Sequence, residues 1–443
     1  MRSLQIVSLA VVASAAALLG TVPACARAGE AGFEYSQEGD TPVFGTGSCV
    51  GASCPDGACV TTLRGTVVAP NGLDPVYNAV VFVPTAPLAP IEHGARCEEC
   101  NTISGSPISS AVSAADGRFE LEVPAGDHVP FVVQLGKWRR QVTLPHVTPC
   151  TSTELAPEYS RLPRSHREGD IPLHAVSTGN CDRLECVLRK IGLDDAEFTT
   201  PDDPSSGRVH LYRENGTTVP GIPPADTLTS DGAKMKGYDL VLFDCAGEAL
   251  AKQVSQKQNV VDYANGGGRI FASHFSYVWL YDIAPFSGTA SWDTGADIPS
   301  FESMPAKLDT SFPRGRAFAR WMTRVGALDS EADRSIQVLD PRFDVTGLVP
   351  PTQRWIYTED PPSIQEFTFN APLDAPVDKQ CGRVAFSDFH VTGASCTPDG
   401  LEFPRECENA GAVMSQQERV LEFMLFDLAS CIQDYGPPTQ VIK

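Results

Sequence analysis

The stretch YDLVLFDCAGEALAKQVSQKQNVVDYANGGGRIFASHFS, residues 238–276, decides the fold of the second half of the chain. It opens on a short apolar run, YDLVLF, which has the length and composition of a buried strand. A helical pattern follows over EALAKQVSQKQNVVDYAN, with Leu250, Val254 and Val261 on one face, and three glycines end it. The apolar run RIFASHF, residues 269–275, is a second strand. A strand, a helix and a further strand in this order predict parallel strands joined by a crossover helix.

The same alternation of strands and helices extends over residues 172–435. Before the deciding stretch, IPLHAVSTG is predicted as a strand and NCDRLECVLRKIGL as a helix that ends at Gly192. After it, GRVAFSDFHV, residues 382–391, is predicted as a strand, and SQQERVLEFMLFDLASCI as an amphipathic C-terminal helix. This half is therefore expected to be an α/β domain with a parallel sheet and helices on both of its faces.

The first half of the chain has a different pattern. Residues 61–152 contain short runs in which apolar and polar residues alternate, as in GRFELEVPAG, where Phe119, Leu121 and Val123 are the apolar set. Short strands at this spacing predict an all-β sandwich. Residues 153–171 have no clear period and are interpreted as a linker between the two domains.

The N-terminus has the features of an export signal. Residues 1–28 contain a positively charged start, an apolar run and a small-residue cleavage region, and residues 29–60 are interpreted as a Cys-rich tether. The segment VPAC resembles a bacterial lipobox, in which Cys25 would carry the lipid and anchor the protein to a membrane. Cleavage by an ordinary signal peptidase after Ala26 or Ala28 is the alternative. Either cut places the protein in the cell envelope or outside the cell.

Cysteine content and charge agree with export. The chain contains 14 cysteines, and cysteines in an oxidising compartment form disulfides by default. If Cys25 is lipidated, an odd number remains. Cys245, at the end of an apolar run, is then the expected free thiol, buried as a small hydrophobic residue. The formal net charge of −21 argues against a nucleic-acid partner.

One loop offers a second interpretation of its cysteines. Cys97 and Cys100 form a C-x-x-C pair, with His93 and Glu98 close by in the sequence. These residue types could bind zinc. A loop closed by disulfides is the favoured interpretation, because exported cysteines are usually oxidised.

The first half also resembles a known family. GTVVAPNGLDPVYNAVVFVP, residues 65–84, and SAADGRFELEVPAG, residues 113–126, are similar to the carboxypeptidase regulatory-like domain, a transthyretin-like β-sandwich. The matching positions are Gly65, Pro75, Ala79, Asp116, Gly117 and Phe119. The resemblance implies a structural or adhesive module that does not catalyse a reaction.

The second half contains a Tyr-Asp strand, a tyrosine shortly before three glycines, and two strands that lead to histidines. Together these features resemble the ThuA-like branch of the class I glutamine amidotransferase-like fold. The matching positions are Tyr238, Asp239, Tyr263, Gly266, Gly267, Gly268, His274, Gly382, Arg383, Val384 and His390. The resemblance implies a flavodoxin-like parallel sheet whose carboxyl strand ends line the ligand crevice. The residues expected at that edge are Ser273, His274, Asp244, Cys245, Asp388 and His390.

Glutamine amidotransferase activity is not expected. Catalytic members of that fold place a cysteine in a Gly-x-Cys-x-Gly turn after the strand that corresponds to residues 269–273. Here the turn reads ASHFSY, without a cysteine or a flanking glycine. A nucleophile turn tolerates little but small neighbours, and Phe275 is large.

Two uses of the crevice remain open. His274, His390 and Asp388 are the candidate catalytic residues, because imidazoles and a carboxylate can transfer protons. Ser273, Asp244, Tyr277 and Trp279 are the candidate ligand-binding residues, since aromatic rings with a polar edge suit sugars.

The favoured interpretation is an exported envelope protein that binds glycans or cell-wall material without catalysis and without a cofactor. A divalent metal is considered but not favoured. The alternatives are a hydrolase or sugar-modifying enzyme that uses the His/Asp site, and a structural envelope component.

Overall fold

The computed structural model describes most of the chain from Cys59 onward. The described residues are 43–44 (backbone), 59–97, 103–205, 207–295, 301–392, 396, 402–408, 413–430 and 432. The predicted export signal, the lipidation site Cys25 and nearly all of the tether lie outside these ranges. Among the described residues, no helix has the length and apolar character needed to cross a membrane.

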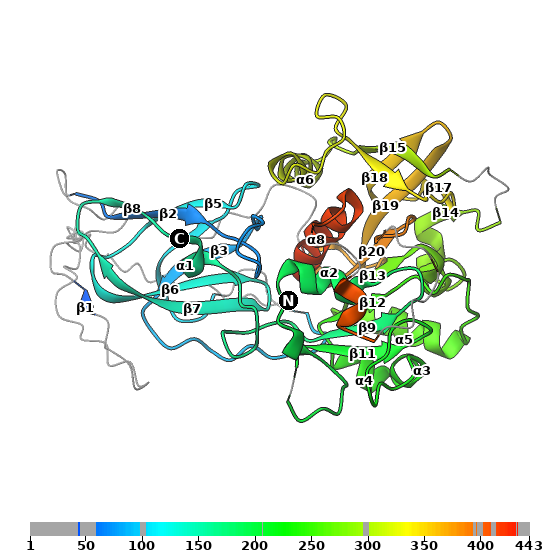
Figure 1. Ribbon diagram of the computed structural model, residues 1–443, viewed down its shortest axis with the longest axis horizontal. Coiled ribbons are helices and arrows are strands. Elements are labelled where there is room, and N and C mark those ends of the chain that lie inside the picture. Colours follow the sequence, from blue (N-terminus) through cyan, green and yellow to red (C-terminus); the bar gives the residue numbers. More distant parts are fainter. Residues whose placement is uncertain are drawn as a thin grey trace, which may run out of the picture. The chain divides into compact units, whose positions relative to one another are not determined.

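The first half of the described chain forms two sheets (Figure 1). One has the strand order β1-β6-β3-β4 with β7 paired to β6, and the other has the order β5-β2-β8. The bounds are β1 Val43–Phe44, β2 Thr62–Thr66, β3 Val80–Pro84, β4 Pro107–Val112, β5 Arg118–Glu122, β6 Gly126–Leu135, β7 Trp138–Val147 and β8 Ser152–Glu154. The strand pairs are antiparallel apart from β2 with β8. On β5, Phe119 and Leu121 are buried while Arg118 and Glu120 are exposed, so the predicted alternation is confirmed.

The second half is built on a ten-stranded mixed sheet with the order β10-β11-β9-β12-β13-β20-β19-β18-β15-β16 (Figure 1). Its bounds are β9 His174–Thr178, β10 Phe198–Thr199, β11 Val209–Arg213, β12 Leu240–Phe243, β13 Arg269–Ser273, β15 Ser303–Leu308, β16 Ser335–Leu339, β18 Gln353–Glu359, β19 Pro362–Ala371 and β20 Gly382–Ser387. A separate two-stranded sheet pairs β14 Ala290–Trp292 with β17 Val345–Leu348.

This sheet is parallel in only one part. The neighbours from β10 to β20 are all parallel, as the sequence predicts. From β20 to β16 every pairing is antiparallel. The prediction of a parallel sheet is therefore wrong for this second part. The chain passes from β18 to β19 through a short turn, which joins antiparallel strands, whereas parallel strands need a long crossover.

Helices bury both faces of the parallel part. The helix bounds are α1 Pro157–Ser160, α2 Leu184–Ile191, α3 Asp226–Thr229, α4 Gly232–Lys236, α5 Val254–Asn265, α6 Pro313–Arg324, α7 Arg405–Glu408 and α8 Gln416–Ala429. On β12, Leu240 and Leu242 join the apolar cluster of α2 and α8, while Val241 and Phe243 join that of α5. A strand with both faces covered reads as a continuous apolar run, which is what the sequence shows.

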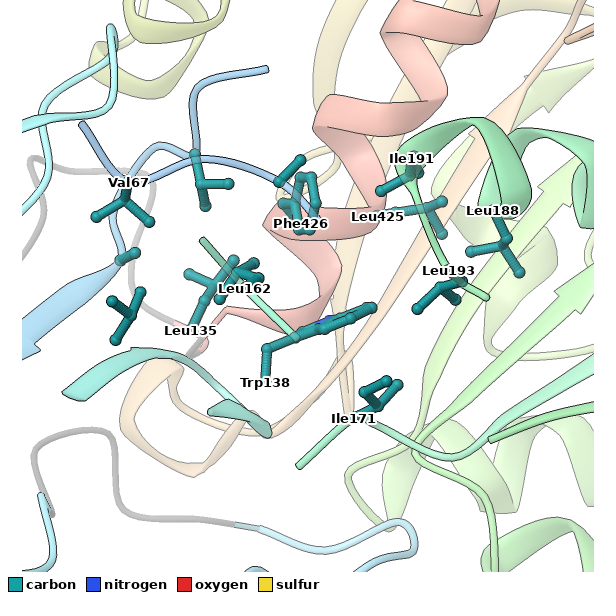
Figure 2. Packing of buried hydrophobic residues seen from close by; sticks show 14 of the residues in the cluster. Val67, Leu135, Trp138, Leu162, Ile171, Leu188, Ile191, Leu193, Leu425 and Phe426 are labelled. Atoms are coloured by element: carbon teal, nitrogen blue, oxygen red, sulfur yellow. The ribbon is translucent and has the colours of Figure 1, made fainter. Parts of the chain in front are cut away.

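One apolar cluster runs through both halves of the described chain (Figure 2). Trp138 of β7 packs edge-on against Phe426 of α8, with ring centroids 6.1 Å apart, close to Ile191 of α2. Leu162 and Ile171, from the segment predicted as a linker, are fully buried in the same cluster. This segment is therefore packed into the core and does not hold the two halves apart.

Disulfides are present, as predicted, and they connect distant parts of the chain. The described pairs are Cys59–Cys150, Cys97–Cys381, Cys181–Cys396 and Cys186–Cys407. The zinc interpretation of the C-x-x-C loop is wrong for Cys97, whose sulfur is taken by Cys381. His93 pairs instead with Asp239, with Nδ1 2.7 Å from Oδ2. Cys245 is the one free cysteine in the described part of the chain, and it is buried.

His174 makes the fold sensitive to acid. It opens β9, lies fully buried beneath Trp138, and its ring Nδ1 is 3.3 Å from the carbonyl oxygen of Arg208. Burial lowers the pKa of His174 to about 4. The unfolded chain, with an ordinary histidine pKa near 6.5, takes up this proton first. His174 therefore costs stability as the pH falls from about 6.5 to about 4, by roughly 3 kcal/mol in total.

Replacement of His174 with a neutral residue should remove this contribution. Between pH 7 and pH 4, we expect the free energy of unfolding to fall by about 2–3 kcal/mol more in the wild type than in His174→Gln. Urea unfolding at a series of pH values measures the difference. Parallel stability curves for the two proteins would contradict the assignment.

Candidate thiol and imidazole site at the carboxyl edge of the sheet

Three neighbouring parallel strands end beside one another. β12, β13 and β20 are paired in register, with Phe243 opposite Ala272 and Ser273 opposite Ser387. The residues that follow these strand ends therefore meet at one edge of the sheet. This is the edge at which open α/β sheets bind ligands.

Cys245, His274 and His390 converge at this edge. Nδ1 of His274 lies 2.7 Å from Nε2 of His390. Sγ of Cys245 lies 3.3 Å from the former nitrogen and 3.6 Å from the latter. The exposed fractions are 0% for Cys245, 0% for His274 and 3% for His390, so the cluster is enclosed. The predicted proximity of the two histidines is confirmed, although they are 116 residues apart in sequence.

The backbone at His274 makes a sharp turn. Its φ is +38°, in the left-handed region that non-glycine residues rarely adopt, and the 3₁₀ helix His274–Trp279 begins there. A strained residue between a strand and a helix is the geometry that nucleophile turns use. The large Phe275 does not prevent this turn, contrary to our expectation. The turn presents an imidazole, and the thiol comes from the next strand.

Cys245 is a free and buried thiol, as predicted. Its sulfur lies in a polar cluster beside two imidazoles, which the sequence did not indicate. Burial, and secondly the Asp182 carboxylate, raises the pKa of the Cys245 thiol well above its ordinary value. Burial, with His390 and Arg342 nearby, lowers the pKa of His274 well below its ordinary value. Neutral thiol and neutral imidazole are thus the favoured forms, which is the opposite of the thiolate–imidazolium pair of cysteine hydrolases.

The loop DPRFD, residues 340–344, covers the outer sides of both rings. Oδ2 of Asp340 lies 3.4 Å from Nδ1 of His390, and Oδ2 of Asp344 lies 3.7 Å from Nε2 of His274. Nε of Arg342 donates to Nε2 of His274 at 2.7 Å. Sequence reasoning missed these three residues. Their signal is the alternation of charged residues at 340, 342 and 344 within a short connection between strands.

Three other predicted site residues lie next to this cluster but face other partners. Ser273 donates to Oδ2 of Asp182 at 2.5 Å. Asp388 accepts from the backbone N–H of Val345 at 3.3 Å, and burial, with Asp344 beside it, raises its pKa well above the ordinary value. Burial likewise raises the pKa of the Asp244 carboxyl. These carboxyls are held in environments that favour the protonated form.

The two aromatic residues among the predicted ligand-binding residues are buried. Tyr277 and Trp279 are 4% and 2% exposed and belong to the apolar core beneath the sheet edge. The ring of Trp279 stacks on Phe243 with centroids 4.8 Å apart. Tyr277 and Trp279 both belong to the 3₁₀ helix His274–Trp279, which has three residues per turn, so alternate residues do not share a face.

A small recess with a volume of about 10 Å³, room for one water-sized group, opens beside the cluster. Its wall includes Asp244 and Trp279, two of the predicted ligand-binding residues, together with Ser276, Glu214 and Lys252. Nζ of Lys252 pairs with Oε1 of Glu214 at 2.5 Å and lies 5.0 Å above the centre of the Trp279 ring. The recess therefore combines an aromatic ring with charged and hydroxyl groups.

Comparison with known proteins adds little. No family model matches the chain, and no curated protein is significantly similar to it. Among solved structures, the chain is similar to one described as the mmIFT52 N-terminal domain, over 58% of this chain and 97% of that chain, with 9% identity and a TM-score of 0.31. A likeness of this size supports no conclusion about function.

Proposed function

We propose that this is an exported cell-envelope protein that binds a small polar ligand at the carboxyl edge of its α/β sheet. In this proposal a carboxypeptidase regulatory-like β-sandwich precedes a ThuA-like, flavodoxin-like domain. Four described disulfides support an oxidising compartment. The parallel order β11-β9-β12-β13-β20 supports the fold assignment.

The recess beside Cys245 is the observation that carries the binding proposal. It lies where ligands bind in open α/β sheets, and it combines an apolar ring with a few convergent polar groups. Its volume of about 10 Å³ is that of roughly one water-sized group, so only a small part of a ligand enters it. A single hydroxyl of a sugar unit, from a glycan or from cell-wall material, is a group of suitable size to enter between Glu214 and Lys252.

Lys252→Met tests this proposal, because methionine keeps an unbranched side chain and removes the ammonium. We expect the wild type to bind monosaccharides or soluble wall fragments in calorimetric titrations. The variant should bind them about 10–100-fold more weakly, the effect of losing one charge-assisted hydrogen bond. Lys307→Met is the matched control, since Lys307 forms an exposed ion pair with Glu359 on another part of the sheet.

Two outcomes would contradict the binding proposal: no binding of any such ligand by the wild type, or equal binding by both variants. Thermal unfolding shows whether Lys252→Met is still folded. If it is not, Glu214→Gln provides a second variant.

A hydrolase or sugar-modifying enzyme is the second candidate, favoured by the 2.7 Å approach of His274 and His390 next to the recess. In that case the imidazoles would exchange protons with a ligand, and Asp340 would orient His390. Asp388 would act through Asp344. Conversion of a bound ligand to product during the titrations would favour the enzyme over the binding protein.

A further inference from the structure

The spacing of the three donor atoms fits a metal ion. Around tetrahedral zinc, bond lengths of about 2.3 Å to sulfur and 2.0–2.1 Å to nitrogen place sulfur and nitrogen ligands about 3.6 Å apart and two nitrogens about 3.4 Å apart. The Cys245 sulfur lies 3.3 and 3.6 Å from the two imidazole nitrogens. The two nitrogens, at 2.7 Å, need to separate by about 0.7 Å to reach this spacing. Each of the three residues offers one ligand atom, and these atoms all lie within 4.8 Å of one another.

The surroundings of the sulfur suit a thiolate ligand. The backbone N–H of Gly247 points at Sγ of Cys245 at 3.4 Å, and the backbone N–H of Phe275 also donates to this sulfur. Such N–H donors stabilise negative charge on sulfur. A metal cation supplies what the cluster otherwise lacks, a positive charge that allows a buried thiol to ionise.

One outer ring nitrogen has the partner that metal-bound histidines have, since Oδ2 of Asp340 lies 3.4 Å from Nδ1 of His390. At His274, Oδ2 of Asp344 lies 3.7 Å from Nε2, beyond hydrogen-bond distance, and Arg342 donates to this nitrogen. A histidine that binds a metal through one nitrogen usually donates the N–H of the other to a carboxylate or carbonyl, which fixes its ring. The side chain of Asp340 is half-exposed, so the carboxylate next to His390 is in contact with solvent.

We propose that Cys245, His274 and His390 bind one divalent cation, Zn²⁺ by preference, through one thiolate and two neutral imidazoles. A thiolate with two imidazoles selects borderline-soft ions such as Zn²⁺ over Ca²⁺ or Mg²⁺, which take oxygen ligands. Three protein ligands leave the fourth position for water or for a ligand atom. The thiol proton of Cys245 is released to solvent when the metal–sulfur bond forms. This inference uses other atoms than the recess and does not depend on sugar binding.

Arg342 opposes metal binding. Neutral His274 carries one ring proton, and Arg342 donates to Nε2, so this proton lies on Nδ1. Nδ1 is the atom that must bind the metal. The proton must therefore move to Nε2, where Asp344 accepts it and Arg342 must leave. We expect Arg342→Met to bind zinc more tightly than the wild type, and Asp344→Asn to bind it about 10–100-fold more weakly.

The experiment uses the mature protein with its disulfides intact, stripped of metal with a chelator and kept free of reductant. Zn²⁺ is titrated by calorimetry, and Co²⁺ by absorption, because a cobalt–thiolate bond gives a charge-transfer band. We expect about one ion per chain and a thiolate band in the wild type. Cys245→Ser and His390→Gln should each abolish the band. Each should weaken zinc binding by more than roughly 100-fold, because loss of a ligand costs more than loss of a residue that only contacts a ligand. His146→Gln, at an exposed His–Asp pair of the first half, is the matched control and should bind like the wild type.

Two results would overturn the proposal. One is a wild-type protein with a free Cys245 thiol, verified by alkylation after unfolding, that binds neither ion. The other is that Cys245→Ser and His390→Gln have the same cobalt band or zinc affinity as the wild type. This result counts if the two variants unfold at the wild-type temperature in the absence of metal. Lys252→Met should keep full zinc binding, so failure of the recess proposal and failure of the metal proposal are separable.

Discussion

Asp427→Asn should lower the free energy of unfolding by about 3–5 kcal/mol, the usual cost of removing one partner from a buried ion pair. Asp427 lies on α8 and holds two arginines. Its Oδ2 is 2.7 Å from Nη1 of Arg383 on β20, and its Oδ1 is 3.0 Å from Nη1 of Arg314 on α6. The side chains of all three residues are at most 3% exposed. Without the carboxylate, two buried positive charges lose their counter-ion.

This network matters for the site because Arg383 belongs to the strand that leads to His390. Chemical denaturation monitored by tryptophan fluorescence measures the loss. Asp378→Asn removes the same charge from a fully solvated pair with Lys379 and should change stability by less than about 0.5 kcal/mol. If Asp427→Asn and Asp378→Asn changed the free energy of unfolding by similar amounts, the two buried arginines would not need the Asp427 carboxylate as a counter-ion.

Trp138→Ala should cost about 3–5 kcal/mol, as for other large aromatic residues removed from a core. Trp138 is 3% exposed and belongs to the cluster that both halves of the described chain share (Figure 2). Its ring contacts Phe426 on one side and His174 on the other. Since these contacts join the first half to α8 and β9, the cavity would weaken the connection between the halves and not only the strand that carries Trp138.

Calorimetry separates these possibilities. We expect one unfolding transition in the wild type and a lower transition temperature, or two transitions, in Trp138→Ala. Leu73→Ala is the control, because Leu73 is 79% exposed and its loss should be within about 0.5 kcal/mol of neutral. A cost below about 1 kcal/mol for Trp138→Ala would mean that the cavity collapses or that the halves pack loosely.

The parallel part of the sheet was predictable from the sequence because its strands are buried on both faces. The run at β12 is apolar throughout, and β13 is apolar over residues 270–272. The helix α2 ends at Gly192, as predicted, with this residue in the left-handed conformation. The start of α5 was not predictable to the residue. The helix begins at Val254, where Gln253 and Gln256 form a capping box, and residues 248–253 instead form the loop that supplies Lys252 to the recess.

The site was predictable only in part. The approach of His274 and His390 follows from strand order, since both residues come just after neighbouring parallel strands. Cys245 was expected at this edge of the sheet, but the contact of its sulfur with both rings depends on how the chain turns after β12, and an apolar run before a cysteine does not contain that information. The charged residues at 340, 342 and 344 come from a strand connection distant in sequence, so only tertiary structure places them on the histidine rings.

In our proposal, one thiol and two imidazoles at the sheet edge form a single metal centre. Anomalous X-ray diffraction at the zinc absorption edge, from crystals of the protein grown with zinc, tests this directly. We expect one strong peak about 2.0–2.3 Å from Sγ of Cys245, Nδ1 of His274 and Nε2 of His390. Zinc only at surface carboxylates, with the Cys245 sulfur turned away from both rings, would contradict this expectation.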